Sequence, residues 1–597
     1  MGTKPQRNMS STGQIGESRG RRLDSWKAIA QFLGRDVRSV QRWEHERGLP
    51  VYRLPGQKGG AVFAYEKELE QWLLSRENGA AASAGALSPA DILPPALTSG
   101  TLHGWRIWIG TTLAALCLLV AAIVILRRGS TDLPTILPSA PRSVAVLPMQ
   151  NLSGDPAQEY FADGFTEELV SELAQIRSLR VISRTSTMIY KGSRKSLPQI
   201  ARELHVKYIL EGSVARDGQR VRVIAQLIDA TTDTHVSAHT YDSDLKGILD
   251  IQGRISRAIA DDVRLDLSPQ ERNRLASVRA VDPEAHDFYL KASYDFAQQT
   301  PESIRESLAL YRQAAAKDSS FALPFVGIAQ AEAALLQITA EGPEESVRHQ
   351  EEALTRALSI DPHLGDARGL LAWQAYVHDR DWPRAEREFR MALTEGAQAP
   401  TEQRFGVGLD TRGRFGEGTA HLQTALELDP LGKSPRVSQF FGFYFQRKFG
   451  EARRELEELL TLSPDFLAGH ALLGLTATMQ HDCALTGLQA QWIGKRFPSP
   501  LADIESAFAD ACRGNASAAR ANLERAAASK GPAFASPYQI ALGYAAIGDR
   551  DAALLYLERS ADLRESQALY IRVDPLFNSL RAEPRFIALE KRLGLAQ

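Results

Sequence analysis

Apolar residues follow different patterns in four stretches of the chain. Residues 22–77 combine short helical and strand-like runs, and residues 107–126 are apolar without interruption. Residues 142–275 mix strand alternation with helical spacing, whereas residues 282–597 keep helical spacing throughout. Polar or Pro-, Gly- and Ala-rich segments separate these stretches, at residues 1–21, 78–104 and 128–141. We therefore predict a multidomain chain with a polar tail and two linkers.

The first stretch, residues 22–77, predicts two short helices followed by a hairpin. Ser25 is placed to cap a helix that contains Ile29, and Asp36 to cap a second helix that buries Val40 and Trp43. Strand-like runs at residues 51–54 and 61–65 flank a Gly-rich turn, and a closing helix packs Leu69, Trp72 and Leu73 inward. This order of elements is typical of a winged helix-turn-helix.

A DNA-binding surface follows if Val40 and Trp43 face the core. Arg and Gln can read base edges, and basic residues in the turn and wing can hold phosphates. The predicted DNA-contacting residues are Arg35, Arg38, Ser39, Gln41, Arg42, Arg53 and Lys58. The segment from residue 21 to residue 77 has eleven Lys or Arg against eight Asp or Glu. This small excess predicts weak, salt-dependent binding by a monomer, and hence a homodimer on double-stranded DNA.

The run LGRDVRSVQRWEHERGLPV, followed by the hairpin, resembles the winged helix-turn-helix of MerR and excisionase proteins. The resemblance implies DNA binding through residues 35–42 and the wing. Asp36 stands where that family commonly has a Ser cap, which keeps the capping chemistry. The alternative is a three-helix protein-interaction module with solvated arginines.

The uncharged run at residues 107–126 predicts one transmembrane helix, within residues 105–127. Twenty residues give about 30 Å of helix, the thickness of the hydrocarbon core of a bilayer. Trp105 and Trp108 open the run and Arg127 and Arg128 close it, as interfacial anchors do. A buried helix of a soluble domain is the alternative.

The orientation of this helix rests on two signals that disagree. A DNA-binding module must lie in the cytoplasm, which would place the C-terminal region outside the inner membrane of a bacterium. Positive charge should gather on the cytoplasmic flank, yet Arg127 and Arg128 follow the span and only Arg106 closely precedes it. We expect the first signal to decide, and the reverse topology is the alternative.

Residues 142–275 predict an α+β domain with both crossover and hairpin connections. Asp217–Gly218 is a strong turn signal between two alternating runs. We predict strands at residues 143–148, 179–183, 208–215, 221–229 and 235–241, and helices at residues 160–175, 198–204 and 249–265.

Three stretches of this region, VAVLPMQNLSGDPAQEYFADGFTEEL, ARELHVKYILEGSV and VRVIAQLIDATTDTHVSAHTYD, resemble the TolB-like domain. That domain occurs in membrane-tethered bacterial regulators and in some cyclases. The resemblance implies a periplasmic or interaction role and supplies no catalytic residues.

Acidic and histidine side chains of this domain are the nearest to candidate chemistry. Five acidic residues near the first helix could ligate a cation, but helical spacing at a helix start favours solvent exposure and dipole stabilisation. They are Asp155, Glu159, Asp163, Glu167 and Glu168. The histidines His205, His235 and His239 have no nucleophile or metal-ligand spacing, so we expect ordinary polar roles.

The C-terminal half repeats with a period of 34 residues. Helix-ending prolines at Pro362, Pro430, Pro464 and Pro498 are 68, 34 and 34 residues apart. Small and aromatic residues recur at the positions that the tetratricopeptide (TPR) family uses for close helix packing; they are Gly418, Ala452, Tyr376, Ala385, Phe389, Ala392, Tyr544, Gly548, Ala553 and Leu557. This resemblance predicts a superhelix of about eight repeats whose groove binds a protein or peptide; a plain helical spacer is the alternative.

The composition of the chain excludes several classes of function. Seventy basic and 72 acidic residues give a net charge of −2, so nucleic-acid binding must be local. The chain has three cysteines, Cys117, Cys483 and Cys512, which are too few for a disulfide framework and lack the spacing of a zinc site. Cys483 and Cys512 could form a disulfide if this region is exported. Otherwise we expect them to be isolated buried thiols. No phosphate-binding loop, metalloprotease helix, nucleophile elbow or kinase motif occurs, so we expect neither an enzyme nor a metal or cofactor site.

Together these patterns predict a single-pass membrane regulator of transcription that binds DNA at its N-terminus. The TolB-like and repeat regions would sense or bind a protein partner. The alternative is a membrane-anchored TPR scaffold that assembles a complex without binding DNA.

Overall fold

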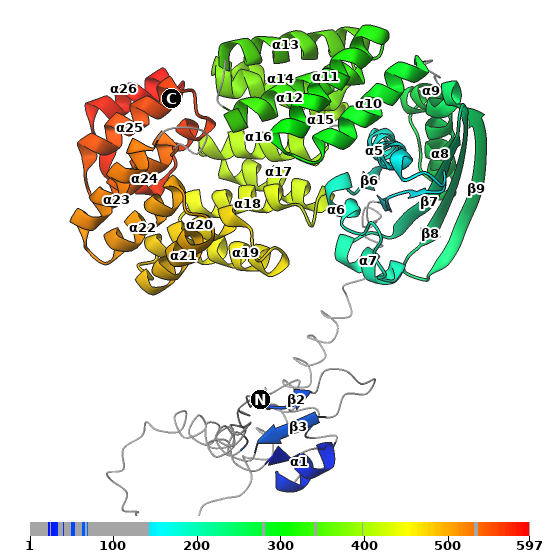
Figure 1. The fold of residues 1–597 in the computed structure, drawn as a ribbon. Coiled ribbons are helices and arrows are strands. Elements are labelled where there is room, and N and C mark those ends of the chain that lie inside the picture. Colours follow the sequence, from blue (N-terminus) through cyan, green and yellow to red (C-terminus); the bar gives the residue numbers. More distant parts are fainter. Residues whose placement is uncertain are drawn as a thin grey trace, which may run out of the picture. The chain divides into compact units, whose positions relative to one another are not determined.

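The computed structural model describes two compact units, within residues 1–133 and 134–597, and each is considered by itself (Figure 1). In the first unit it describes residues 22, 23, 25–33, 37, 40, 49–53, 62–65 and 69. In the second it describes residues 142–276, 281–339, 343–396, 398–529 and 535–595. The predicted transmembrane segment, residues 105–127, and both predicted linkers lie outside the described residues.

The described part of the N-terminal unit is a small sheet with one helix. Its elements are β1 (Arg22–Leu23), α1 (Trp26–Phe32), β2 (Tyr52–Arg53) and β3 (Val62–Tyr65). The predicted hairpin is confirmed, since β2 and β3 are antiparallel, and β1 adds a third strand that the sequence pattern did not predict. The Ser25 hydroxyl caps α1 by accepting from the amide of Ala28 at 3.2 Å.

A small apolar core joins these elements. Ile29, Val40 and Leu69 are fully buried in it, so the inward positions predicted for Val40 and Leu69 are confirmed. Most of the predicted second helix, including Trp43, lies outside the described residues, and the helix-turn-helix stays a prediction.

The second unit begins with a sheet domain of six strands. They are β4 (Arg142–Val146), β5 (Gln150–Asn151), β6 (Leu179–Val181), β7 (Tyr208–Asp217), β8 (Arg220–Asp229) and β9 (Thr234–Asp244). The order is β6-β4-β7-β8-β9, and β5 pairs with β7. β4 is parallel to β6 and β7, whereas β7, β8 and β9 are joined as antiparallel hairpins. The predicted mixture of crossovers and hairpins is therefore confirmed.

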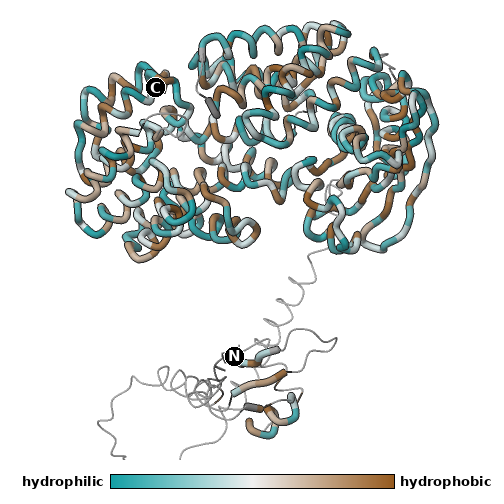
Figure 2. The backbone as a smooth tube through the Cα atoms, viewed as in Figure 1, coloured by the Kyte–Doolittle hydropathy of each residue, from teal (hydrophilic) through white to brown (hydrophobic). Residues whose placement is uncertain are grey.

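Alternating side chains of β4 bury both faces of the sheet. Val144 and Val146 pack with α5 and α8 on one face, and Ala145 packs with α7 on the other. Figure 2 shows these central strands as hydrophobic segments. The helices of the domain are α5 (Glu159–Ala174), α6 (Arg184–Met188), α7 (Leu197–Leu204), α8 (Ile248–Asp262) and α9 (Pro269–Ala276), with short 3-10 turns η1 (Pro156–Gln158) and η2 (Leu245–Gly247).

The rest of the unit is a TPR-like superhelix, which the described residues build from eight helix pairs followed by a C-terminal segment. The pairs are α10 (Pro283–Phe296) with α11 (Pro301–Lys317), α12 (Leu323–Thr339) with α13 (Pro343–Ile360), α14 (Gly365–Gln374) with α15 (Trp382–Thr394), α16 (Ala399–Thr411) with α17 (Phe415–Leu428), α18 (Lys433–Phe445) with α19 (Phe449–Leu462), α20 (Leu467–Met479) with α21 (Cys483–Arg496), α22 (Pro500–Cys512) with α23 (Ala516–Ala528), and α24 (Pro537–Ala546) with α25 (Arg550–Asp562). A π-helical turn, η3 (Ala375–Asp379), extends α14. The C-terminal segment comprises η4 (Ser566–Tyr570), η5 (Pro575–Leu580) and α26 (Pro584–Arg592).

The repeat period is visible in the turns as well as in the helices. The four predicted prolines each stand two residues after the end of a second helix, as expected. The turn inside each pair from α14 to α25 contains a residue with a left-handed backbone, and these residues are Arg380, Gly413, Arg447, His481, Gly514 and Gly548. Gly548 therefore serves the turn. No atom lies within 4 Å of the place where a Cβ would stand, so the predicted role of Gly548 in close helix packing is wrong.

Candidate protein-interaction site

The predicted DNA-contacting residues lie almost entirely outside the described part of the chain. Of the seven, only the backbone of Arg53 is described, as the second residue of β2. Arg35, Arg38, Ser39, Gln41, Arg42 and Lys58 lie outside the described residues. Their DNA contacts stay a prediction.

The sheet domain and the first repeat are joined by a polar cluster around Asp287 of α10. Its Oδ1 accepts hydrogen bonds from the Tyr160 hydroxyl and from Arg216, both at 2.6 Å, and its Oδ2 lies 2.9 Å from Lys291. Burial alone would raise the pKa of the Asp287 carboxyl, but hydrogen bonds from these three partners outweigh burial and lower it. Burial and the neighbouring carboxylate raise the pKa of Tyr160, which therefore stays a donor.

A cavity of about 290 Å³ lies beside this cluster. It is lined by Pro156, Ala157, Glu159, Tyr160, Lys291, Tyr294, Asp295 and Leu310, so η1 and α5 form one wall and α10 and α11 the other. The Lys291 ammonium lies 5.3 Å from the centre of the Tyr160 ring. Two tyrosines, one cation and two carboxylates give the cavity aromatic walls and charges of both signs.

A second junction lies far along the chain, where the sheet domain contacts the turn between α17 and α18. Asp429 is 6% exposed and accepts from the hydroxyls of Ser183 at 2.5 Å and Ser186 at 2.6 Å. The Ser183 amide donates to the Leu428 carbonyl at 2.7 Å. Since the domain holds both the first and the fourth helix pair, the repeats curve around it and the two parts form one body (Figure 1).

Replacing Asp429 with alanine is expected to loosen this second junction, because the buried hydroxyl of Ser186 and the half-buried hydroxyl of Ser183 lose their acceptor. The cost is about 3 kcal/mol, from two such hydrogen bonds. Amide hydrogen exchange at residues 183–186 and 428–431 should become at least about tenfold faster. A tenfold faster exchange corresponds to a loss of about 1.4 kcal/mol in the free energy of local opening. Asp465→Ala, in the exposed turn one repeat later, is the control. Equal exchange in both variants would contradict the assigned role of Asp429.

The expectation that the acidic residues of α5 face solvent is wrong for two of them. Asp163 and Glu168 are 3% and 6% exposed. Asp163 binds Lys191 at 2.6 Å, and Glu168 accepts from Gln252 at 2.6 Å and contacts the His286 ring at 2.8 Å. Helix periodicity gave no sign of this because the partners lie outside α5: Lys191 follows α6, Gln252 is on α8 and His286 is on α10.

Two carboxyls buried inside the superhelix each have an oxygen without a hydrogen-bond partner among the described residues. Asp410 of α16 is 2% exposed, its Oδ1 has no hydrogen-bond partner among the described residues, and burial raises its pKa to about 8. Glu505 of α22 is 3% exposed, and burial raises its pKa well above the usual value. A methyl group at Gly418 would collide with the Asp410 carboxyl, and one at Gly474 would press on that of Glu505. The glycines thus make room for two carboxyls whose pKa burial raises.

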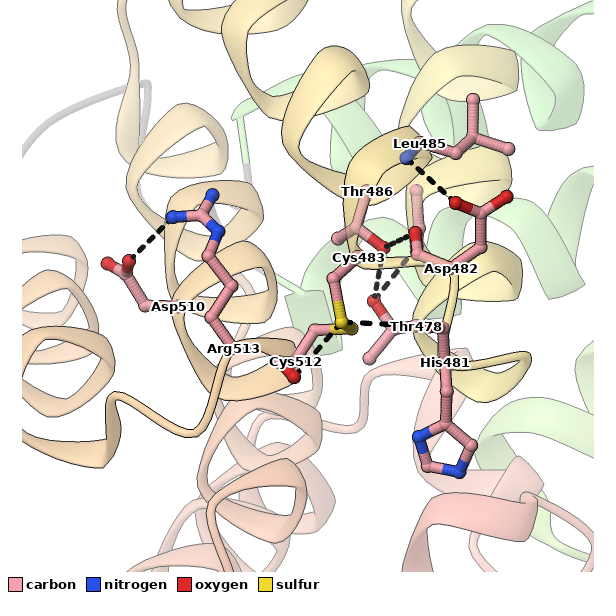
Figure 3. Close-up of a disulfide and its surroundings, with 10 residues drawn as sticks. Thr478, His481, Asp482, Cys483, Leu485, Thr486, Asp510, Cys512 and Arg513 are labelled. Carbon is pink, nitrogen blue, oxygen red and sulfur yellow. Dashed lines mark hydrogen bonds and ion pairs between the residues drawn. A yellow bond between two sulfur atoms is a disulfide. The ribbon is translucent and has the colours of Figure 1, made fainter.

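Cys483 and Cys512 form a disulfide, so the interpretation of both as isolated thiols is wrong and the alternative pairing is confirmed. Cys483 opens α21 directly after its cap residue, Asp482, and Cys512 closes α22 (Figure 3). Their Cα atoms are 5.4 Å apart, inside the range that disulfides span. The bond links the turns of two neighbouring repeats.

Membrane-spanning and metal-binding features are both absent from the described residues. No helix in the described ranges is long and apolar enough to cross a bilayer. No group of three or more His, Cys, Asp or Glu side chains that could hold a metal ion occurs in those ranges.

No protein-family model matches the chain. A curated relative, putative adenylate cyclase 3 of Rhizobium meliloti (strain 1021), is 44% identical over 159 residues. The aligned part makes up 27% of this chain and 27% of the relative, so the chain spans little of the relative's length. The expectation that the chain is not an enzyme is therefore wrong: a relative named as a putative adenylate cyclase shares this segment, so an enzymatic function is not excluded.

Solved structures with similar helices include YrrB, described as a TPR protein with an unusual peptide-binding site. It is 15% identical over 36% of this chain and 97% of that chain, with a TM-score of 0.23. The human IFIT1 dimer with PPP-AAAA is 13% identical over 53% of this chain and 78% of that chain, with a TM-score of 0.29. At such low TM-scores the superpositions say nothing further about this chain, whose TPR-like architecture follows from its own helix pairs.

Proposed function

We propose that the sheet domain and the repeats together form a protein-interaction scaffold. The observation that carries the proposal is the cavity between α5 and α10, at the point where a TPR-like stack begins on a rigid neighbour. Repeat stacks bury little of their long surfaces internally and commonly hold peptides or proteins. A partner segment would place an aromatic or basic side chain between Tyr160 and Tyr294, where Asp295 supplies negative charge; the Glu159 carboxylate is already paired with Lys191 at 2.7 Å.

Site-specific photo-crosslinking tests this proposal in cells that make the full chain. A benzophenone amino acid at Tyr294 is expected to form a defined adduct with one partner protein. The same amino acid at Leu488, a 61% exposed position on α21, is the control and should not form that adduct. A pattern of adducts that is the same from both positions would remove the cavity as an interaction site.

DNA binding by the N-terminal unit is a second candidate function. It is supported by the β2–β3 hairpin and by the inward packing of Val40. If residues 36–47 form the predicted helix, a buried Val40 would place Arg38 and Arg42 on the faces of that helix away from the core. The double variant R38A/R42A should lose sequence preference for duplex DNA, since each base contact is worth about 1–3 kcal/mol. Fluorescence anisotropy on selected and scrambled duplexes measures the difference. Undiminished discrimination would show that these arginines do not read bases.

Adenylate cyclase activity is a candidate because of the relative's name alone. The assay is formation of cyclic AMP from ATP by the purified chain, with heat-denatured chain as the control. Formation of more cyclic AMP than in the control would support cyclase activity of this chain. If no cyclic AMP forms, the similarity to the relative is one of sequence in the shared segment and not of activity.

We also propose that the repeats face an oxidising compartment, beyond the membrane that the apolar run at residues 107–126 would cross. The support is the Cys483–Cys512 disulfide, because such bonds persist outside the reducing cytosol. Trapping free thiols in intact cells with N-ethylmaleimide is expected to leave both cysteines unmodified until a reductant is added. C483S and C512S single variants each expose one thiol and calibrate the assay. Modification of both cysteines without reductant would place the repeats in the cytoplasm.

A further inference from the structure

Seven arginines gather where the C-terminal segment returns to the middle repeats. Three come from turns or helix ends in consecutive repeats, and four come from the segment after α25. We define this arginine cluster as Arg380, Arg412, Arg447, Arg564, Arg572, Arg581 and Arg592.

Hydrogen bonds between distant parts of the chain place these side chains together. Arg380 donates to the carbonyls of Arg592 at 3.2 Å and Ala561 at 3.1 Å. Arg412 donates to the Gly594 carbonyl at 2.9 Å, and Arg572 donates to the adjacent carbonyl, that of Leu595. The cluster thus surrounds the ends of α25 and α26.

The other members are joined to the same surface. Arg564 donates to the His378 carbonyl at 3.5 Å, and Arg447 donates to the Asn578 side chain at 2.8 Å. Burial, Arg447 and Arg572 lower the pKa of Arg581, while Glu590 and Asp574 raise it, so Arg581 has charges of both signs around it and burial outweighs the rest.

The cluster carries more positive charge than its neighbours neutralise. Among the described residues, Arg592 alone of the seven forms a salt bridge, to Asp562 at 2.9 Å. Arginines elsewhere in the repeats, such as Arg368 and Arg414, each bind two carboxylates. Helix C-terminal carbonyls account for part of the arrangement, but each helix end carries only about half a negative charge.

Unused hydrogen-bond donors accompany this excess of charge. A guanidinium group has five N–H donors in a planar fork, and the contacts above use one or two of them in six of the seven side chains. Several guanidinium groups with free donors suit an anion that has many oxygens and several charges, which a single carboxylate lacks.

We propose that the arginine cluster is a binding site for an oligophosphate group. The ligand is a small molecule that carries two or more linked phosphates, held at the surface between the turns after α14, α16 and α18 and the C-terminal segment. This site lies on repeats three to five and on the C-terminal segment, separate from the cavity between α5 and α10.

Isothermal titration of the full chain with sodium tripolyphosphate tests the site. Arg564 and Arg581 are exposed, and Arg564 makes only one long hydrogen bond, to the His378 carbonyl, so R564Q/R581Q should keep the fold. This variant is expected to bind tripolyphosphate about tenfold more weakly, whereas R453Q/R525Q, which removes the same charge from salt-bridged positions, should bind as the wild type does. Thermal unfolding of each variant checks that the fold is kept.

Three results would overturn the proposal. The first is no binding of tripolyphosphate by the wild-type chain at millimolar concentration. The second is equal weakening in both double variants, which would indicate screening by net charge. The third is that a ten-residue polyglutamate peptide binds as tightly as tripolyphosphate does. The surface would then be a binding site for acidic protein segments.

Discussion

Replacing Asp410 with asparagine is expected to stabilise the repeats increasingly as pH rises from 4 to 8. Burial raises the pKa of Asp410 to about 8 in the folded chain, against a usual value of 3.8. Between these values the folded state keeps a proton that the unfolded state releases, so the wild type loses about 1.4 kcal/mol per pH unit. Asparagine does not titrate, and its advantage should reach roughly 4 kcal/mol at pH 7.

Urea unfolding of the full chain at pH 4.5, 6 and 7.5 measures this difference. Asp551→Asn is the control, because the Asp551 side chain is 98% exposed and should leave the pH dependence unchanged. A D410N variant whose advantage over the wild type is the same at all three pH values would contradict a protonated, buried Asp410.

Replacing Glu168 with leucine is expected to cost about 3–5 kcal/mol of folding free energy. The change leaves Gln252 and His286 buried without their shared acceptor. It thereby removes a contact of α5 with α8 and one with α10 in a single substitution. Glu168→Gln keeps an acceptor oxygen and should lose much less. Thermal unfolding followed by tryptophan fluorescence and circular dichroism measures both variants.

Glu302→Leu is the control for this experiment, since Glu302 is 77% exposed and its partner Arg305 lies 3.9 Å away. A surface pair of this kind contributes at most about 1 kcal/mol. If Glu168→Leu cost no more than Glu302→Leu, the buried pair would not hold the sheet domain to the first repeat.

Local patterns in the sequence predicted most of the secondary structure of the second unit. Asp217–Gly218 predicts the β7–β8 turn because this dipeptide suits a left-handed backbone, and Gly218 has a φ of +58°. Pro430 and Pro464 predict helix ends because proline cannot continue a helix. These features depend on residues only a few positions apart.

Features that depend on distant residues were not predicted. Asp429 looks like a residue before a helix-ending proline, and only the folded chain brings Ser183 and Ser186 to it. Asp410 looks like an ordinary polar position of a helix, yet α17 and α18 cover it completely. The cavity beside Asp287 likewise needs α5 and α10 together, and neither segment alone indicates it.

The proposed interaction of the sheet domain and the repeats with a protein partner depends on the cavity between them. The most direct measurement is the affinity of the partner captured at Tyr294 for the purified full chain and for its Leu310→Glu variant, which places a charge in the cavity wall. We predict that this variant binds at least about tenfold more weakly, a loss of about 1.4 kcal/mol or more, while Leu488→Glu binds as the wild type does. Equal affinity for Leu310→Glu and the wild-type chain would contradict binding at the cavity.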